Sequence, residues 1–180
     1  MAPAPLPLVL VATGRNFPDA LGGSAAAGAV GGVVVLSDDS TLHQPVLDYV
    51  TQKQQAGAFA ATVGGPAAPS YPAADEAIVG ADRYDSAASV ADTFFVSPAN
   101  GVPIAAGLAT GTTFPDALSG GAFMALVTGP MLLTQPTGLN AHAGSFLSTH
   151  RARVDYPFIF GGEGAVSYDV DGQVAAAITD

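Results

Sequence analysis

The stretch that decides the fold occurs twice. Ala12–Leu21 is ATGRNFPDAL, and 97 residues further along the chain Ala109–Leu118 is ATGTTFPDAL. The same offset aligns Gly64-Gly65 with Gly161-Gly162, and the overlap needs no gap. Identities gather at turns and helix starts, as expected for two copies of one architecture. The chain is therefore a tandem repeat.

Each copy alternates short apolar strands with helices. Pro115 and Asp116 mark a helix start in the second copy, because Pro needs no N–H donor there and Asp complements the helix dipole. The expected strands are Leu8–Ala12, Val33–Leu36, Phe59–Val63, Pro103–Ala109, Met131–Thr134 and Val154–Phe160. Apolar strands joined through helices predict parallel sheets covered on both faces. We expect an α/β fold of two tandem, small three-layer modules with short parallel sheets flanked by helices.

A further helix lies between the copies. Ala87, Val90, Ala91, Phe94 and Phe95 fall on one helical stripe, which predicts an amphipathic helix that begins near Asp82 to Ser86. By the offset, its counterpart in the first copy would precede residue 1. We therefore expect a first module over residues 1–79 that lacks its first helix, and a complete second module over residues 80–180.

Composition excludes several classes of partner. Five Lys and Arg face fifteen Asp and Glu, for a net charge of −10. Nucleic acid and anionic lipid surfaces are disfavoured, because phosphate contacts need basic residues. No run of about 18 apolar residues exists, so membrane insertion is not expected. The chain has no cysteine, which excludes disulfides and thiolate metal sites.

Residues capable of catalysis or metal binding do not form a known constellation. The carboxylates Asp169 and Asp171 lack calcium-loop spacing, and the histidines lack an H-x-x-x-H partner. Ser24 and Ser119 lie outside a G-x-S-x-G elbow. We expect no metal, no cofactor and no catalytic residue. A small-ligand enzyme on the α/β scaffold is the least favoured hypothesis.

The two T-G-x-x-F-P-D loops admit two interpretations. They place backbone N–H groups at helix starts after parallel strands, where an anion can bind. The alternative is a helix-start device in which Asn16 and Asp19 satisfy free N–H groups. The loop candidates for ligand binding are Arg15, Asn16, Asp19, Thr113 and Asp116.

Arg83 is a specific choice in a chain with so few basic residues. It lies in Asp82-Arg83-Tyr84, at the start of the helix between the copies. It could form an ion pair with Asp82 or Asp85, or pack along Tyr84. It could also contact a polymer or another module, because its planar fork suits carboxylate and phosphate groups. Asp82, Arg83 and Tyr84 are therefore candidate ligand-binding residues.

The ordered motifs resemble one family, the bacterial cell-wall-binding repeat type 2 modules. The residues that carry the resemblance are GADRYDSAASVADTFF (Gly80–Phe95), ATGTTFPDALSGG (Ala109–Gly121), PMLLT (Pro130–Thr134) and FGGEGAVSYDV (Phe160–Val170). The first copy repeats the later motifs.

The resemblance implies non-catalytic attachment of an exported surface protein to anionic polymers or glycans of a Gram-positive wall, outside the cell. Surface-layer proteins and autolysins use such modules, usually in threes that pack as a pseudo-trimer. It also implies that residues of the Pro-x-Leu-Leu region pack between modules: Pro130, Leu132 and Leu133, with Val34 and Leu36 in the first copy.

Two features depart from the family pattern. Only one module is complete, so we expect an excised fragment or self-association that supplies a third module. The charge of −10 opposes binding to an anionic polymer unless local Arg sites, divalent cations or a neutral glycan mediate it. The alternative function is a structural module for oligomerisation or protein–protein assembly at the cell surface.

Overall fold

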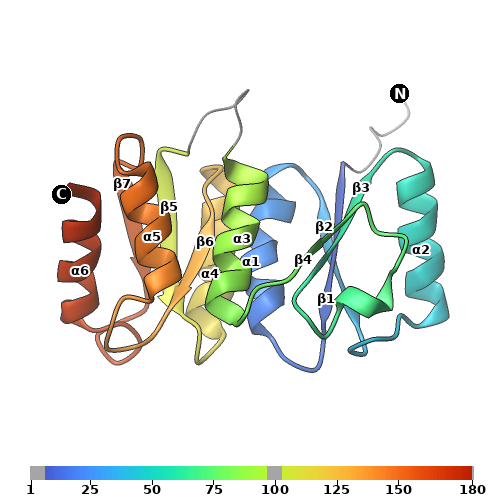
Figure 1. Ribbon diagram of the computed structural model, residues 1–180, viewed down its shortest axis with the longest axis horizontal. Coiled ribbons are helices and arrows are strands. Elements are labelled where there is room, and N and C mark those ends of the chain that lie inside the picture. Colours follow the sequence, from blue (N-terminus) through green and yellow to red (C-terminus); the bar gives the residue numbers. More distant parts are fainter. Residues whose placement is uncertain (1–6, 97–102, 180) are drawn as a thin grey trace.

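The computed structural model describes residues 7–96 and 103–179, in which two parallel sheets follow one another along the chain (Figure 1). The first sheet has the strand order β2-β1-β3-β4 and the second has the order β6-β5-β7. The strands are β1 (Leu8–Thr13), β2 (Val33–Ser37), β3 (Phe59–Val63), β4 (Glu76–Ile78), β5 (Ala105–Thr110), β6 (Met131–Thr134) and β7 (Tyr156–Phe160). Every strand pair is parallel, which confirms the predicted α/β class.

The two sheets share their construction at the atomic level. The N–H of Gly14, after β1, donates to the carbonyl of Ser37 at 2.8 Å. Its counterpart Gly111, after β5, donates to the carbonyl of Thr134 at 2.9 Å. The offset of 97 seen in the sequence therefore relates backbone hydrogen bonds as well as residues.

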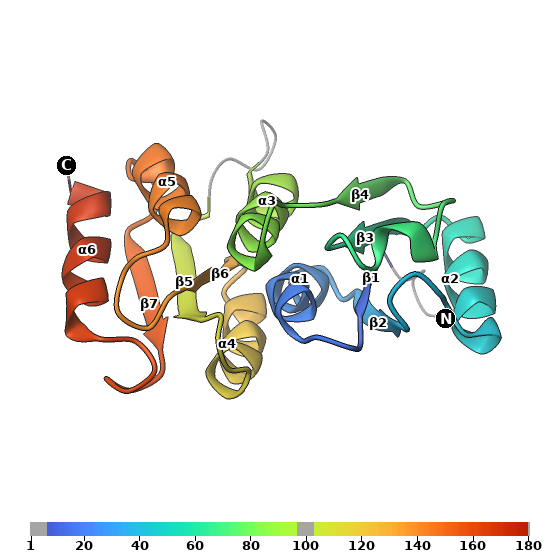
Figure 2. The ribbon, with the colours of Figure 1, turned by 60° about the horizontal axis from the view of Figure 1, so that its bottom comes forward.

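A layer of three helices lies between the sheets (Figure 2). It consists of α1 (Pro18–Ala29), α3 (Arg83–Phe95) and α4 (Pro115–Leu126). The outer faces of the sheets are covered by α2 (Gln44–Gln55) on the first, and by α5 (Ala141–His150) and α6 (Tyr168–Thr179) on the second. One buried cluster contains Leu10 of the first sheet, Val90 of α3 and Leu133 of the second. The two repeats therefore share a core.

Small residues let the helices of the middle layer approach closely. A Cβ added to Gly22 of α1 would lie 3.2 Å from the Cα of Ala87 in α3. A Cβ added to Gly28 of α1 would lie 2.7 Å from the Cβ of Ala125 in α4. The abundant Ala and Gly therefore permit a thin layer in which one set of helices serves both sheets.

The copies diverge after their third strands. The second copy continues from Tyr168 into α6, whereas the first has a short 3-10 helix at Ala68–Ser70 and then β4. The sequence pattern does not predict β4. This three-residue strand forms through parallel pairing with β3, in which Ala61 faces Glu76 and Val63 faces Ile78. Tertiary pairing, rather than local pattern, creates it.

Candidate functional site

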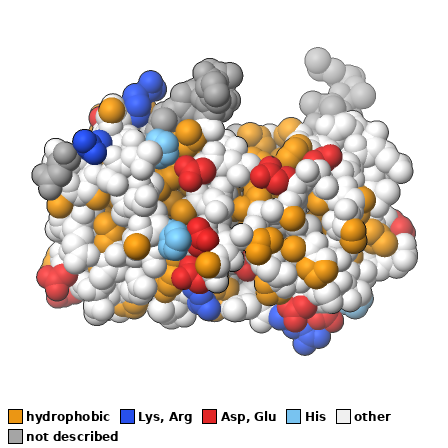
Figure 3. Space-filling view, viewed as in Figure 1, with side chains coloured by type: hydrophobic (Ala, Val, Ile, Leu, Met, Phe, Trp, Pro, Cys, Tyr) orange, Lys and Arg blue, Asp and Glu red, His pale blue; other side chains and the backbone are white. Residues whose placement is uncertain are grey.

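On the face of the molecule shown in Figure 3, the charged side chains form no basic patch. On the face shown in Figure 3, Lys and Arg side chains lie at the edges of the molecule and Asp and Glu are interspersed across it. Within residues 7–96 and 103–179, no helix has both the length and the apolar character needed to cross a membrane. Because the Lys and Arg side chains on this face are scattered, a site there for an anionic ligand would depend on individual basic residues.

The first turn of α3 is held by reciprocal capping. The carboxylate of Asp82 accepts hydrogen bonds from the N–H groups of Tyr84 and Asp85, at 2.8 and 2.9 Å. Asp85 in turn accepts from the N–H of Ala81 at 2.8 Å. Capping of this kind satisfies donors that a helix start leaves free. It also fixes the backbone from which Arg83 projects.

Arg83 ties the start of α3 to the second sheet. Its Nη1 donates to the carbonyl oxygen of Gly111, directly after β5, at 2.5 Å. The ring of Tyr84 packs on the same glycine, since a Cβ at Gly111 would lie 2.7 Å from the ring. Among the described residues no carboxylate lies within 4.0 Å of the guanidinium, so the ion pair with Asp82 or Asp85 is not formed.

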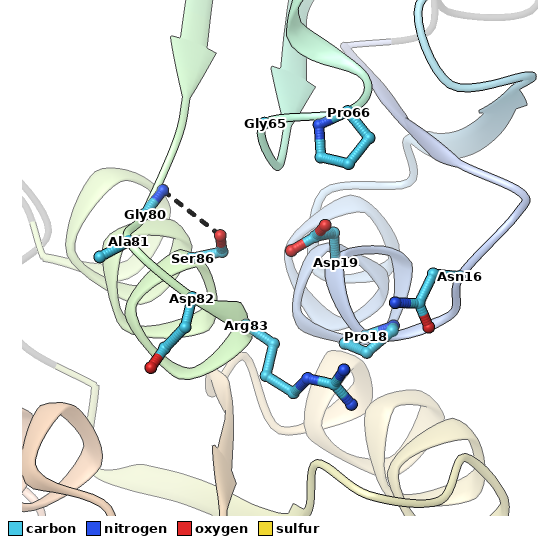
Figure 4. A pocket seen from close by; sticks show the side chains of 10 residues that line it. All are labelled: Asn16, Pro18, Asp19, Gly65, Pro66, Gly80, Ala81, Asp82, Arg83 and Ser86. Atoms are coloured by element: carbon cyan, nitrogen blue, oxygen red, sulfur yellow. Dashed lines mark hydrogen bonds between the residues drawn. The ribbon is translucent and has the colours of Figure 1, made fainter.

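A pocket of about 230 Å³ lies beside Arg83, between α1, α3 and the turn after β3 (Figure 4). Its lining residues come from three segments of the chain: Asn16, Pro18, Asp19, Gly65, Pro66, Gly80, Ala81, Asp82, Arg83 and Ser86. Four of the predicted ligand-binding residues, Asn16, Asp19, Asp82 and Arg83, therefore share one cavity.

Asp19 is the half-buried acid of this pocket. Burial raises the pKa of its carboxyl group, while a hydrogen bond from Ser86 and the charge of Arg83 oppose the shift. Its carboxylate occupies the space that a Cβ would need at Gly64, where φ is +87°. The second repeat has the same arrangement, because a Cβ at Gly161 would lie 2.8 Å from Oδ2 of Asp116. The Asp of each F-P-D loop thus packs over the first Gly of each Gly-Gly turn.

Asn16 contributes to the start of α1, as the helix-start interpretation proposes. Its Oδ1 accepts from the N–H of Phe17 at 3.1 Å. Phe17 itself occupies the N-cap position and makes no side-chain cap. Figure 4 shows the carboxamide nitrogen of Asn16 on the side of the pocket. Asn16 can therefore serve the helix and a ligand together.

Two His–Asp pairs hold α3 against α5. Nδ1 of His142 lies 3.2 Å from Oδ1 of Asp85, and Nε2 of His150 lies 3.3 Å from Oδ1 of Asp92. The wall of the pocket formed by α3 is therefore braced from the second repeat, while α1 and the turn after β3 supply the opposite wall from the first.

Arg15 lies outside this pocket and has its own partner. It makes a bidentate pair with Asp38, through Nε to Oδ1 and through Nη2 to Oδ2 at 2.9 Å. The hydrogen bond from Arg15 lowers the pKa of the Asp38 carboxyl group. Arg15 borders a separate, mainly apolar groove where the rings of Phe17 and Phe114 lie 5.8 Å apart between centroids.

The remaining loop candidates of the second repeat are not in the Arg83 pocket. Thr113 is exposed on the loop between β5 and α4, and Asp116 is partly exposed over Gly161. Neither residue lines the cavity with Arg83.

The residues predicted to pack between modules occupy three environments. Leu133 is buried in the core shared by both repeats. Leu132 is buried in a different cluster, with Phe146 and Val170 on the outer face of the second sheet. Pro130, two residues before Leu132 in the sequence, is also buried. Val34 is partly buried against the shared core and Leu36 is exposed.

Several pocket residues were not singled out from the sequence. Ser86 contributes its hydroxyl, which accepts from the N–H of Gly80 at 3.3 Å. Gly65 and Pro66 form the turn opposite. The recurrence of the Gly-Gly pair marked that turn, but only the packing of α3 against α1 shows that it faces Arg83.

Fold and site together define a class: a tandem α/β repeat whose pocket is built across the junction of the repeats. The sequence profile described as "Cell wall binding domain 2 (CWB2)" matches residues 77–171. That match covers more than half of the chain, which belongs to this family of cell-wall-binding modules. A search of curated proteins found no match.

Solved structures share the fold. Cwp6 from Clostridium difficile has a TM-score of 0.80 at 20% identity, over 98% of this chain and 28% of that one. Cwp8 from Clostridium difficile has a TM-score of 0.76 at 17% identity, over 96% of this chain and 30% of that one. The chain thus spans under a third of the length of either protein.

Proposed function

We propose that the chain is a non-catalytic module that anchors an exported surface protein to wall polymers of a Gram-positive bacterium, outside the cell. Family membership supports the general role. The observation that carries the proposal is the junction pocket, where a capped helix start presents Arg83 beside polar groups from the other repeat. The proposed ligand is a wall glycan or an anionic wall polymer.

The pocket is organised for binding in advance. One guanidinium nitrogen of Arg83 is engaged by Gly111, which orients the fork while leaving other N–H donors for a ligand. Asp82 is held by the helix start and cannot move freely. Fixing side chains before binding reduces the conformational entropy lost when a polymer binds.

Sedimentation with purified cell walls tests this function. We expect the chain to pellet with intact walls and to stay in the supernatant after mild extraction removes the wall polymers. Parallel samples with added salt and with calcium separate direct binding from cation bridging. A chain that stays in the supernatant under every condition would contradict the proposal.

A second candidate function, assembly at the cell surface, rests on unequal exposure of equivalent faces. Leu21 of α1 is 4% exposed, within the middle layer, whereas its counterpart Leu118 of α4 is 56% exposed. Leu133 of β6 is fully buried, whereas its counterpart Leu36 of β2 is 53% exposed. The buried surfaces of α1 and β6 at the contact between the repeats therefore have exposed counterparts on α4 and β2. A further module or a second copy of the chain could cover these exposed counterparts.

Light scattering across a concentration series tests this candidate. Leu118→Ser on the exposed α4 face should lower the apparent mass. Tyr168→Ser, at a residue that is 74% exposed on α6, is the matched control and should not change it. A wild-type monomer at every concentration would contradict self-association.

A further inference from the structure

A groove of about 150 Å³ lies between α3 and α5 and shares no lining residue with the pocket that contains Arg83. It contains the two His–Asp pairs, His142 with Asp85 and His150 with Asp92. Figure 3 shows two histidine surfaces adjoining acidic ones on the face of the molecule that it draws. The groove therefore brings together nitrogen and oxygen atoms of the kind that bind metal ions.

The spacing of the two donor atoms in each pair fits a chelated metal ion. Nδ1 of His142 lies 3.2 Å from Oδ1 of Asp85, and Nε2 of His150 lies 3.3 Å from Oδ1 of Asp92. A hydrogen bond between a charged imidazole and a carboxylate is shorter, about 2.7–2.9 Å. Two ligand atoms at about 2.0–2.1 Å from a tetrahedral Zn²⁺ are about 3.3–3.4 Å apart. Both pairs thus hold their donor atoms close to the separation that one zinc ion spans.

The protein holds these ligands in place before a metal binds. Oδ2 of Asp85 accepts a backbone hydrogen bond at the start of α3, at 2.8 Å, so that Oδ1 remains for the imidazole. The N–H of His142 donates to the side chain of Asn140 at 2.8 Å, which anchors it in the first turn of α5. The ring of His150 packs edge-on against Phe146, with 4.7 Å between centroids. Ligands that are already oriented lose less conformational entropy on binding.

The types of ligand atom select the class of metal. Imidazole nitrogen suits zinc, copper and nickel, whereas calcium and magnesium prefer oxygen ligands alone. Along residues 7–96 and 103–179, no three His, Asp or Glu side chains gather into one metal-binding group. Each ion therefore has two protein ligands and keeps water in its other positions. The two carboxylates are seven residues apart on α3, about 10 Å, so the two ions are separate.

We infer that the groove between α3 and α5 binds divalent transition-metal ions such as Zn²⁺, one at each His–Asp pair. Each ion joins a carboxylate of α3 to an imidazole of α5, so it cross-links the two helices and stabilises the folded chain. The sequence pattern predicts no metal site, because the partner of each histidine comes from another helix. This metal binding goes beyond the proposed attachment to the wall and does not depend on it.

Titration with zinc chloride tests the inference by two measurements. We expect Zn²⁺ to raise the Tm of the chain and to shift the imidazole NMR signals of His142 and His150. Magnesium chloride at the same concentration should do neither, which separates coordination from the general attraction of cations to a net charge of −10. An unmoved signal at either histidine, or an equal rise in Tm with magnesium, would overturn the inference.

Histidine variants assign the effect to each pair. His142→Gln and His150→Gln should each weaken Zn²⁺ binding at the altered pair by at least about tenfold and leave the signal of the other histidine responsive. His43→Gln is the matched control and should respond like wild type, because His43 is exposed and no carboxylate in the described part of the chain lies within 4.0 Å of its ring nitrogens. A rise in Tm with Zn²⁺ that persists when both His142 and His150 are replaced would contradict the assignment. The NMR titration of the wild-type chain decides the matter even where a variant fails to fold.

Discussion

Replacing Gly64 with alanine should damage both stability and the site. Gly64 has φ of +87°, a conformation that costs an L-residue about 1–2 kcal/mol. Its new Cβ would also overlap the carboxylate of Asp19, and overpacking of this kind costs about 1–3 kcal/mol more. The expected loss in the free energy of unfolding is therefore about 2–5 kcal/mol.

Gly57→Ala is a matched control. Gly57 has φ of +99°, but a Cβ there would meet nothing within 4 Å. It should cost only the conformational part, about 1–2 kcal/mol. Urea denaturation of both variants measures the difference, which isolates the contact between residue 64 and Asp19.

Removing the Asp19 side chain completes the test. In an Asp19→Ala background the overlap is absent, so the cost of Gly64→Ala should fall to that of Gly57→Ala. Displacement of Asp19 should also weaken wall binding in Gly64→Ala but not in Gly57→Ala. Equal costs for the two single variants, or a cost of Gly64→Ala unchanged without Asp19, would refute this reasoning.

Four further predictions address the core, the helix cap and pH. Leu133→Ala should lower the free energy of unfolding by about 2–5 kcal/mol and keep one urea transition, whereas two transitions would contradict a core shared by both repeats. Asp82→Ala should cost about 1 kcal/mol in thermal unfolding and Asp82→Asn much less, because Asn can still cap; equal losses would contradict capping. The raised pKa of Asp19 adds stability below about pH 3.9 that is lost as pH rises through its folded-state pKa, so Asp19→Asn should gain in Tm relative to wild type above about pH 4. The lowered pKa of Asp38 acts oppositely: the stability from its pair with Arg15 is present above about pH 3.9 and lost as pH falls, so Tm profiles of Asp38→Asn should converge with wild type in acid.

The repeat made most of the fold predictable. An offset of 97 places equivalent strands, turns and helix starts, and the structure confirms them, as with Gly14 and Gly111. The same offset fails after Tyr71, because the equivalent segment in the second copy forms a helix while the first forms β4. β4 depends on pairing with β3, which no local pattern of residues reveals.

The sequence indicates individual residues of the site, but it does not show which of them come together in one pocket. Asp82 and Arg83 stand out because basic residues are scarce and the helix start is explicit in the sequence. That Asn16 and Asp19 join them, while Arg15 pairs with Asp38 elsewhere, follows from the packing of α3 across the junction. Such contacts between repeats are set by the shared core and have no signature in either repeat alone.

Wall sedimentation of two arginine variants tests the central claim most directly. Arg83 and Arg151 each donate from Nη1 to a backbone carbonyl, but only Arg83 lines the junction pocket. Arg83→Gln should reduce pelleting with purified walls by at least about tenfold in affinity, while Arg151→Gln should pellet like wild type. Equal pelleting of the two variants would contradict a wall-binding site at the junction of the repeats.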